Sequence, residues 1–182
     1  MTADLKAHAD RLRELHHAGE TLVLPNVWDA ASAKIVAEAG FPVVATASAA
    51  ISAMLGYPDG EGAPWQEMFA AAGRVARVVP VPVTVDAEAG YGMEPRELVD
   101  RLLEIGAVGC NLEDTDHRAG GLVDADANAE RLAAIRAAAG RRRGPDRHQR
   151  ARRHLPAKVR GARAGAGRGG GAPRPSLPAG RG

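Results

Sequence analysis

Residues 82–92 read PVTVDAEAGYG: an apolar run ends at Asp86, Glu88 follows two residues later, and a Gly-Tyr-Gly turn closes the stretch. A short run that is apolar along its whole length is typical of a parallel strand covered on both faces. The period-two spacing of the two acids predicts that both side chains point the same way from an extended segment. The stretch therefore predicts a buried parallel strand that ends in a polar site.

Strand-like and helix-like segments alternate on either side of this stretch, through the first 139 residues. Apolar runs predict strands at 21–25, 42–47, 82–86 and 107–113, and apolar residues at helical spacing predict helices at 4–19, 30–40, 64–79, 95–106 and 125–140. Asp29 is placed to cap the second of these helices, and several helices stop at a glycine. This alternation predicts an α/β fold built on a parallel sheet.

Polar residues gather where the predicted strands end: Ser48 after the second, Asp86 and Glu88 after the third, and Glu113 and Asp114 after the fourth. The carboxyl ends of parallel strands lie side by side, and α/β enzymes build their sites there. Acids at strand ends can also cap the following helix, but Glu88 and Glu113 lie too far before their helices for that. We therefore expect a functional site at this edge of the sheet.

Three carboxylates, from Asp86, Glu88 and Glu113, would repel one another in a pocket unless protons or a cation offset their charge. The group contains no His or Cys, and oxygen ligands suit Mg²⁺ or Mn²⁺ better than zinc. Mg²⁺ keeps several waters, so one or two of the acids would bind directly and the others through water. The substrate expected at such a site is a small anion.

The composition bounds the class of protein. The chain has 182 residues, 45% of them hydrophobic, with no apolar run long enough to span a membrane and no signal-peptide pattern, so we expect a soluble cytoplasmic protein without membrane partners. The single cysteine, Cys110, excludes an internal disulfide, and its apolar surroundings predict an inert buried thiol.

The net charge of +2 conceals two opposite parts. Residues 1–139 carry 11 Lys and Arg against 21 Asp and Glu, whereas residues 140–182 carry 13 against one. The second part has no hydrophobic periodicity and contains ten glycines in 43 residues. We therefore divide the chain into a folded part, 1–139, and an Arg/Gly/Ala/Pro-rich tail, 140–182, that is expected to be disordered.

Four motifs in the folded part, LPNVWDAASAKIVAEAGF, ATASAAISAMLGYPDGE, VPVTVDAEAGYG and GAVGCNLEDT, together resemble the isocitrate lyase/phosphoenolpyruvate mutase superfamily. The resemblance implies a (β/α)₈ barrel, of which residues 1–139 would form the first four βα units. It also implies a Mg²⁺-dependent lyase or mutase (Mn²⁺ being an alternative) that cleaves or forms a C–C or P–C bond in a 2-oxo acid or its enolate. Full-length members of the family are expected to be homo-oligomers.

The resemblance also implies roles for individual residues. Asp86 would be the direct metal ligand, Glu88 stands where the family usually has Asp, and Glu113 matches an acid that reaches the metal through water. Backbone N–H groups in the turn after the second strand, at Ser48 and Ala49, would bind the substrate carboxylate. Two further candidates are Asp59, which matches a catalytic acid beside the metal, and Trp28, which would line the pocket floor or pack in the core.

One motif departs from the lyases of this family. They carry a Lys-x-Cys-Gly-His loop after the fourth strand whose Cys is the general acid, whereas this chain has DTDHRAGGLVDAD, with neither Lys nor Cys. The pattern resembles the mutase, oxaloacetate hydrolase and decarboxylase side of the family. His117 in this loop is either a proton donor or a surface residue.

The basic tail has two interpretations. It is either an arm for nucleic acid, although it has no aromatic residue for base stacking, or the product of a shifted reading frame. Read one nucleotide later with permitted codons, DRHQRARRHLPA (146–157) spells TVINARADTFL, which resembles the fifth strand of the family with its substrate-binding Arg. We therefore expect that the native frame was lost within 140–146, and that the chain as written is a half-barrel with open edges, unstable and inactive.

Overall fold

The computed structural model describes residues 2–141 and 159–160. Its helices are α1 (Thr2–His17), α2 (Ala30–Glu38), α3 (Ser48–Leu55), α4 (Trp65–Val78), α5 (Pro95–Glu104) and α6 (Ala125–Arg141). Its strands are β1 (Asn26–Val27), β2 (Val44–Thr46), β3 (Val83–Asp86), β4 (Gly109–Glu113) and β5 (Val159–Arg160).

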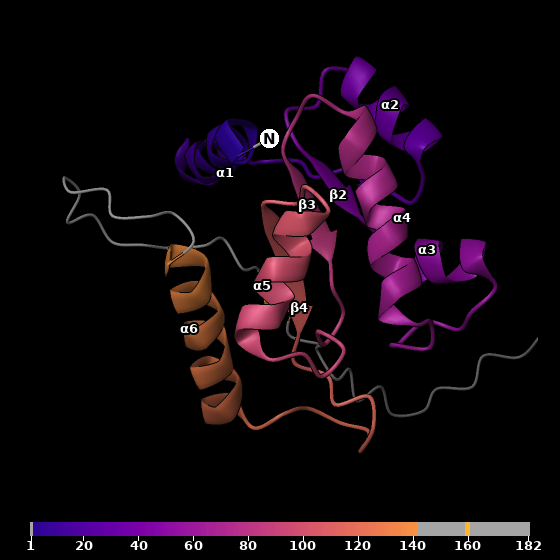
Figure 1. The fold of residues 1–182 in the computed structure, drawn as a ribbon, viewed down its shortest axis with the longest axis vertical. Coiled ribbons are helices and arrows are strands. Elements are labelled where there is room, and N and C mark those ends of the chain that lie inside the picture. Colours follow the sequence, from indigo (N-terminus) through magenta and orange to yellow (C-terminus); the bar gives the residue numbers. More distant parts are fainter. Residues whose placement is uncertain (1, 142–158, 161–182) are drawn as a thin grey trace, which may run out of the picture.

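The strands form one parallel sheet in the order β1-β2-β3-β4-β5, so each strand lies next to its predecessor in the chain. Figure 1 shows α2, α3 and α4 grouped together, α5 beside α6, and α1 set apart from both groups. This arrangement confirms the expected mixed α/β architecture with a parallel sheet. Because the strands all run the same way, the loops after β2, β3 and β4 meet at one edge of the sheet.

The main core lies between the strands and helices α4 and α5, and its fully buried members include Val75, Val83 and Leu98. A second, smaller cluster is centred on Leu12 of α1, with Val43 and Val108, which precede β2 and β4. Helix α1 therefore covers the amino ends of the strands, opposite the edge at which the site is expected.

Local signals for helix ends are confirmed. The carboxylate of Asp29 accepts from the backbone N–H of Ser32 at 2.7 Å, and the Ser32 hydroxyl faces the Asp29 N–H at 3.2 Å, which forms a capping box at the start of α2. Gly40 and Gly106, which follow α2 and α5, have φ of 89°, a left-handed conformation that glycine adopts without a Cβ clash.

Two local predictions were wrong. The first strand is residues Asn26–Val27 rather than 21–25, because Leu22 and Leu24 of the apolar run pack against the α1 cluster instead of joining the sheet. The segment after β2 was expected to be a turn, but Ser48–Leu55 forms helix α3. Its sequence, SAAISAML, is rich in good helix formers, so local propensity favours a helix in place of the expected turn.

The tail lies outside the described residues, apart from Gly140 and Arg141, which end α6, and the two residues of β5. Its predicted disorder, the shifted frame and the nucleic-acid alternative therefore stay predictions. Across the described part of the chain, no helix has both the length and the apolar character needed to cross a membrane. The expected location in the cytoplasm likewise stays a prediction.

Candidate active site at the carboxyl edge of the sheet

Asp86, the last residue of β3, is held by the last residue of β2 and by the first residue of α3. One of its carboxylate oxygens accepts from the Ser48 backbone N–H at 3.2 Å and from the Ser48 hydroxyl at 2.9 Å. The Asp86 N–H donates to the Thr46 hydroxyl at 3.0 Å. These contacts fix one carboxylate oxygen, so two of the predicted site residues, Ser48 and Asp86, are brought into direct contact.

Ser48 and Ala49 begin helix α3, so the backbone groups expected to bind an anion lie in the first turn of a helix. Such N–H groups have no acceptor within the helix and sit at the positive end of its dipole, which favours a negatively charged ligand. Ser48 is buried whereas Ala49 is exposed. Trp28, directly after β1, is 43% exposed and does not belong to the buried core of the described residues.

Glu88 does not lie parallel to Asp86. Strand β3 ends at Asp86, and Glu88 has a left-handed backbone with φ of 48°, so the prediction that both side chains project from one extended segment is wrong. Glu88 is 1% exposed, and one of its oxygens accepts from the N–H groups of Gly60 and Glu61 at 3.0 and 2.8 Å. Its other oxygen accepts from the Tyr91 hydroxyl. Both oxygens therefore already have protein donors, and its role as a metal ligand stays a prediction.

Glu113 ends β4, the strand next to β3, and its N–H donates to the Glu88 carbonyl at 2.8 Å. Partial burial, and after it the negative charge of Asp86, raise the pKa of the Glu113 carboxyl. The His117 ring nitrogen Nε2 lies 3.5 Å from a Glu113 oxygen and opposes that shift. Burial is the larger cause of this shift, and the contribution of Asp86 shows that the two carboxylates lie close enough to interact.

Asp59 lies in the loop between α3 and α4, and its side chain is exposed. The next two residues, Gly60 and Glu61, donate their N–H groups to Glu88, which ties this loop to the one after β3. The His117 ring lies close to Gly60, because a Cβ added there would be 3.2 Å from its Nδ1. The loops after α3, β3 and β4 are thus joined at one place.

The match to known proteins identifies the family. The model of the family described as phosphoenolpyruvate phosphomutase matches residues 12–146. This chain belongs to the phosphoenolpyruvate phosphomutase family. Its carboxyl-edge acids, Asp86 and Glu113, both lie within the matched residues.

Among family relatives, an uncharacterized protein of Mycobacterium tuberculosis (strain ATCC 25618 / H37Rv) is 36% identical over 123 residues, 68% of this chain and 46% of that protein. The oxaloacetate decarboxylase of Bradyrhizobium sp. (strain ORS 278) is 40% identical over 93 residues, 50% of this chain and 32% of its own length. The chain therefore spans less than half the length of these curated relatives.

Solved structures of the family have the same fold. A candidate phosphonomutase from Burkholderia cenocepacia J2315 matches with a TM-score of 0.68 and 43% identity, over 74% of this chain and 56% of that one. Oxaloacetate acetylhydrolase in complex with its product oxalate matches with a TM-score of 0.67 and 31% identity, over 75% and 50% of the two chains. The parallel sheet thus corresponds to the amino-terminal part of a family of (β/α)₈-barrel enzymes.

The family resemblance implies a divalent metal, and the donor set at the edge partly fits one. Within the described residues, no group of three or more His, Cys, Asp or Glu side chains is close enough to hold a metal ion. Asp86 and Glu113 nevertheless offer hard oxygen donors from adjacent strands, and one oxygen of the neighbouring Asp114 is buried without a hydrogen-bond partner in this part of the chain. Two carboxylates with water completing the shell suit Mg²⁺.

Two residues of this edge, Glu61 and Tyr91, were not singled out from the sequence. Tyr91 lies in the Gly-Tyr-Gly turn and Glu61 is the last residue of the motif ATASAAISAMLGYPDGE, but the motifs assign a role to neither side chain. Glu61 contacts Glu88 and Tyr91, which lie 27 and 30 residues away along the chain, and no local spacing encodes such contacts. The Tyr91 hydroxyl donates to Glu88, three residues away, once the turn has brought the two together.

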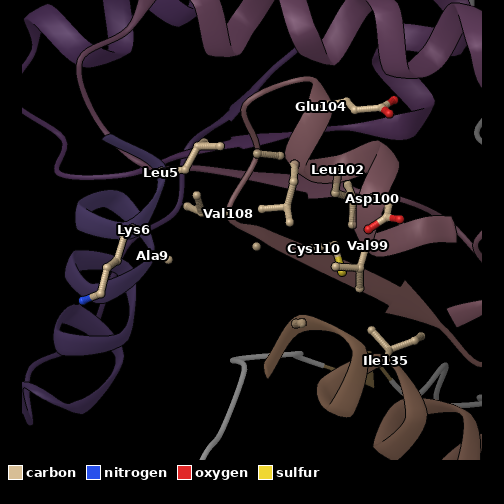
Figure 2. Close-up of a pocket in the computed structure, with 14 residues that line it drawn as sticks. Leu5, Lys6, Ala9, Val99, Asp100, Leu102, Glu104, Val108, Cys110 and Ile135 are labelled. Carbon is tan, nitrogen blue, oxygen red and sulfur yellow. The ribbon is translucent and has the colours of Figure 1, made fainter. Parts of the chain in front are cut away.

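A cavity of about 650 Å³ lies elsewhere, between α1, α5, α6 and the first residues of β4. Figure 2 shows apolar side chains such as Leu5, Val99 and Ile135 around it, with the Lys6 amino group directed away. It meets β4 at Gly109 and Cys110, the opposite end of the strand from Glu113. This cavity is therefore separate from the acidic edge.

Proposed function

We propose that the chain comes from a Mg²⁺-dependent lyase- or mutase-type enzyme that acts on a small 2-oxo acid or its enolate. Relatives named as an oxaloacetate decarboxylase and an oxaloacetate acetylhydrolase support this class of reaction. The observation that carries the proposal is the pair of carboxylates, Asp86 and Glu113, at the ends of adjacent parallel strands and beside the first turn of α3.

Asp86 and Glu113 would hold the cation, and Ser48 would orient Asp86. Ser48 fixes one oxygen of Asp86 with two hydrogen bonds, and this sets the direction in which the carboxylate presents its free lone pairs. Residues that hold a ligating carboxylate in this way commonly change metal affinity by about 10- to 100-fold when they are replaced. When bound, Mg²⁺ would act as a Lewis acid for the oxygens of a 2-oxo acid.

The first turn of α3 would bind the substrate carboxylate. Ala49 is exposed there, and N–H groups in a first helical turn have no acceptor within the helix. Trp28, at the end of β1, has an exposed ring that would shield one side of a bound acid from water. The exposed Asp59 carboxylate is the candidate for holding or moving a proton.

Mn²⁺ binding by the purified chain, followed by electron paramagnetic resonance, tests the metal site without requiring turnover. We expect Asp86→Asn to weaken Mn²⁺ binding by at least about tenfold, because it removes a ligating charge. Asp10→Asn is the matched control, since Asp10 pairs with Lys6 and Arg13 on the remote helix α1. Equal Mn²⁺ affinity in the wild type and Asp86→Asn would contradict the proposed site.

A further inference from the structure

Three residues other than glycine have a left-handed backbone in the described part of the chain: Glu61, Glu88 and Tyr91, with φ of 59°, 48° and 55°. All three lie in the two loops that meet at the carboxyl edge. A conformation of this kind costs about 1–3 kcal/mol per residue and persists only where the surrounding structure imposes it.

The three side chains impose it on one another. Glu88 accepts from the Gly60 and Glu61 N–H groups at 3.0 and 2.8 Å, and Glu61 accepts in return from the Tyr91 N–H at 2.6 Å. The Tyr91 hydroxyl donates to the second oxygen of Glu88. We call Glu61, Glu88 and Tyr91 the loop clamp, because together they join the loop after α3 to the loop after β3.

Contacts from three other elements support the clamp. The Tyr91 ring meets Phe69 of α4 edge-on, with 6.1 Å between the ring centroids. Arg131 of α6 donates to the Ala89 carbonyl at 2.5 Å, and His117 lies against Gly60 from the β4 side. The loops joined by the clamp are thus in contact with α4, α6 and the loop after β4.

Asp59 immediately precedes the two clamped amides, yet its own carboxylate is exposed and makes no hydrogen bond or ion pair within the described residues. A loop that served only to connect α3 and α4 would not require a fixed backbone beside a free carboxylate. We infer that Glu61 and Tyr91 are positioning residues, which act through Glu88 to fix the backbone that carries Asp59 at the carboxyl edge. The role of Asp59 in this inference rests on the proposed function.

Tyr91→Phe removes the hydroxyl that donates to Glu88 and keeps the ring packed against Phe69, so the clamp loses one hydrogen bond with little loss of packing. We expect the Gly60 and Glu61 amides to exchange with solvent deuterium at least about tenfold faster in this variant, because their shared acceptor is no longer held. Glu61→Ala should have the same effect, and Glu61→Gln, which keeps an acceptor for the Tyr91 N–H, should restore most of the protection. NMR on the whole 182-residue chain measures these rates.

Tyr57→Phe is a control within the same loop, because it removes another Tyr–Glu hydrogen bond, 2.9 Å from the Tyr57 hydroxyl to Glu67 in the first turn of α4, and leaves the loop clamp intact. Unchanged exchange at Gly60 and Glu61 in both Tyr91→Phe and Glu61→Ala would overturn the inference. Faster exchange with no rescue by Glu61→Gln would also overturn it, because that result indicates general destabilisation. An equal effect of Tyr57→Phe would overturn it too, because it would show that the loss of any contact of this loop frees these amides, whether or not the clamp is intact. No metal is added, so the outcome is independent of whether Mn²⁺ binding supports the proposed function.

Discussion

At the scale of the residue, the role of a carboxylate depends on its partners more than on its spacing. Asp86 and Glu88 are two residues apart, but the first keeps an oxygen free of the contacts made by Ser48 whereas the second is enclosed by three donors. The difference arises from the left-handed backbone at Glu88, which turns its side chain away from the strand direction. Asp86 is therefore the stronger candidate for the metal, with Glu113 beside it.

The buried thiol of Cys110 gives a prediction at this scale. Burial raises its pKa to about 12, whereas the pKa of the thiol in the unfolded chain is near 9.0. Between these two values the folded protein keeps a proton that the unfolded chain has lost. The contribution of the thiol to stability is complete below the unfolded pKa and is lost as the pH rises from there through the folded pKa. We expect the free energy of unfolding to fall with pH more steeply in the wild type than in Cys110→Ala, by up to about 1.4 kcal/mol per pH unit.

Urea unfolding at a series of alkaline pH values measures this difference, and the other titrating groups cancel because both proteins contain them. Parallel curves for the two proteins would show that the Cys110 thiol titrates in the folded state as it does in the unfolded chain. The same burial leads us to expect that thiol reagents react with Cys110 only after unfolding.

At the scale of the element, helix α1 is held by a close approach to the sheet. A Cβ at Gly109, the first residue of β4, would lie 2.7 Å from the Leu12 side chain and 3.0 Å from the Thr84 hydroxyl oxygen. Leu12 is 1% exposed and forms the centre of the cluster that covers the amino ends of β2 and β4. Glycine is therefore favoured at position 109 because a larger residue would be crowded by these side chains, and not because of its backbone angles.

Gly109→Ala should destabilise the protein by about 1–3 kcal/mol, because the added methyl group overpacks this contact. Leu12→Ala lowers stability by itself, but it makes room for the methyl group, so the two substitutions together should cost less than the sum of their separate effects. Urea unfolding of the wild type, both single variants and the double variant measures this coupling. Strict additivity would show that Leu12 and position 109 are not in contact.

At the scale of the whole molecule, this chain matches about half of each related structure. The match covers 56% of the phosphonomutase chain and 50% of the oxaloacetate acetylhydrolase chain. A barrel of this class closes its sheet with further parallel strands, and closure removes the open edges. The apolar cavity meets β4 at Gly109 and Cys110, before the residues of β4 that pair with β5. Exposed apolar surface of this kind favours association and aggregation.

We expect restoration of the alternative reading frame after about codon 140 to raise the thermal midpoint and to produce Mg²⁺-dependent turnover of a 2-oxo acid. The restored residues would supply apolar strands to the open edge and an Arg opposite the carboxylates. Sequencing the gene around codons 140–146 comes first, followed by calorimetry and an activity assay on both proteins. Mg²⁺-dependent turnover by the 182-residue chain itself would contradict the expectation that it is inactive.

Much of the fold was predictable from the sequence because it depends on local rules. The apolar runs at β2, β3 and β4, the capping residue Asp29 and the glycines that end α2 and α5 are each encoded within a few neighbouring residues. Helix α3 was not predicted, although Ala, Leu and Met in its sequence favour a helix, because no side chain caps its start and the segment is short.

The sequence by itself determined the α/β class, the parallel sheet, the acidic carboxyl edge and the membership of the family, since these follow from periodicity and from motifs that lie along the chain. The tertiary structure alone decided that Ser48 holds Asp86, that Glu88 serves the loop clamp, and that Leu12 crowds position 109. Except for Tyr91 and Glu88, which are three residues apart, the partners in these contacts lie 27 to 97 residues apart, at distances set by how the loops and α1 pack on the sheet. Packing of that kind has no counterpart in local spacing.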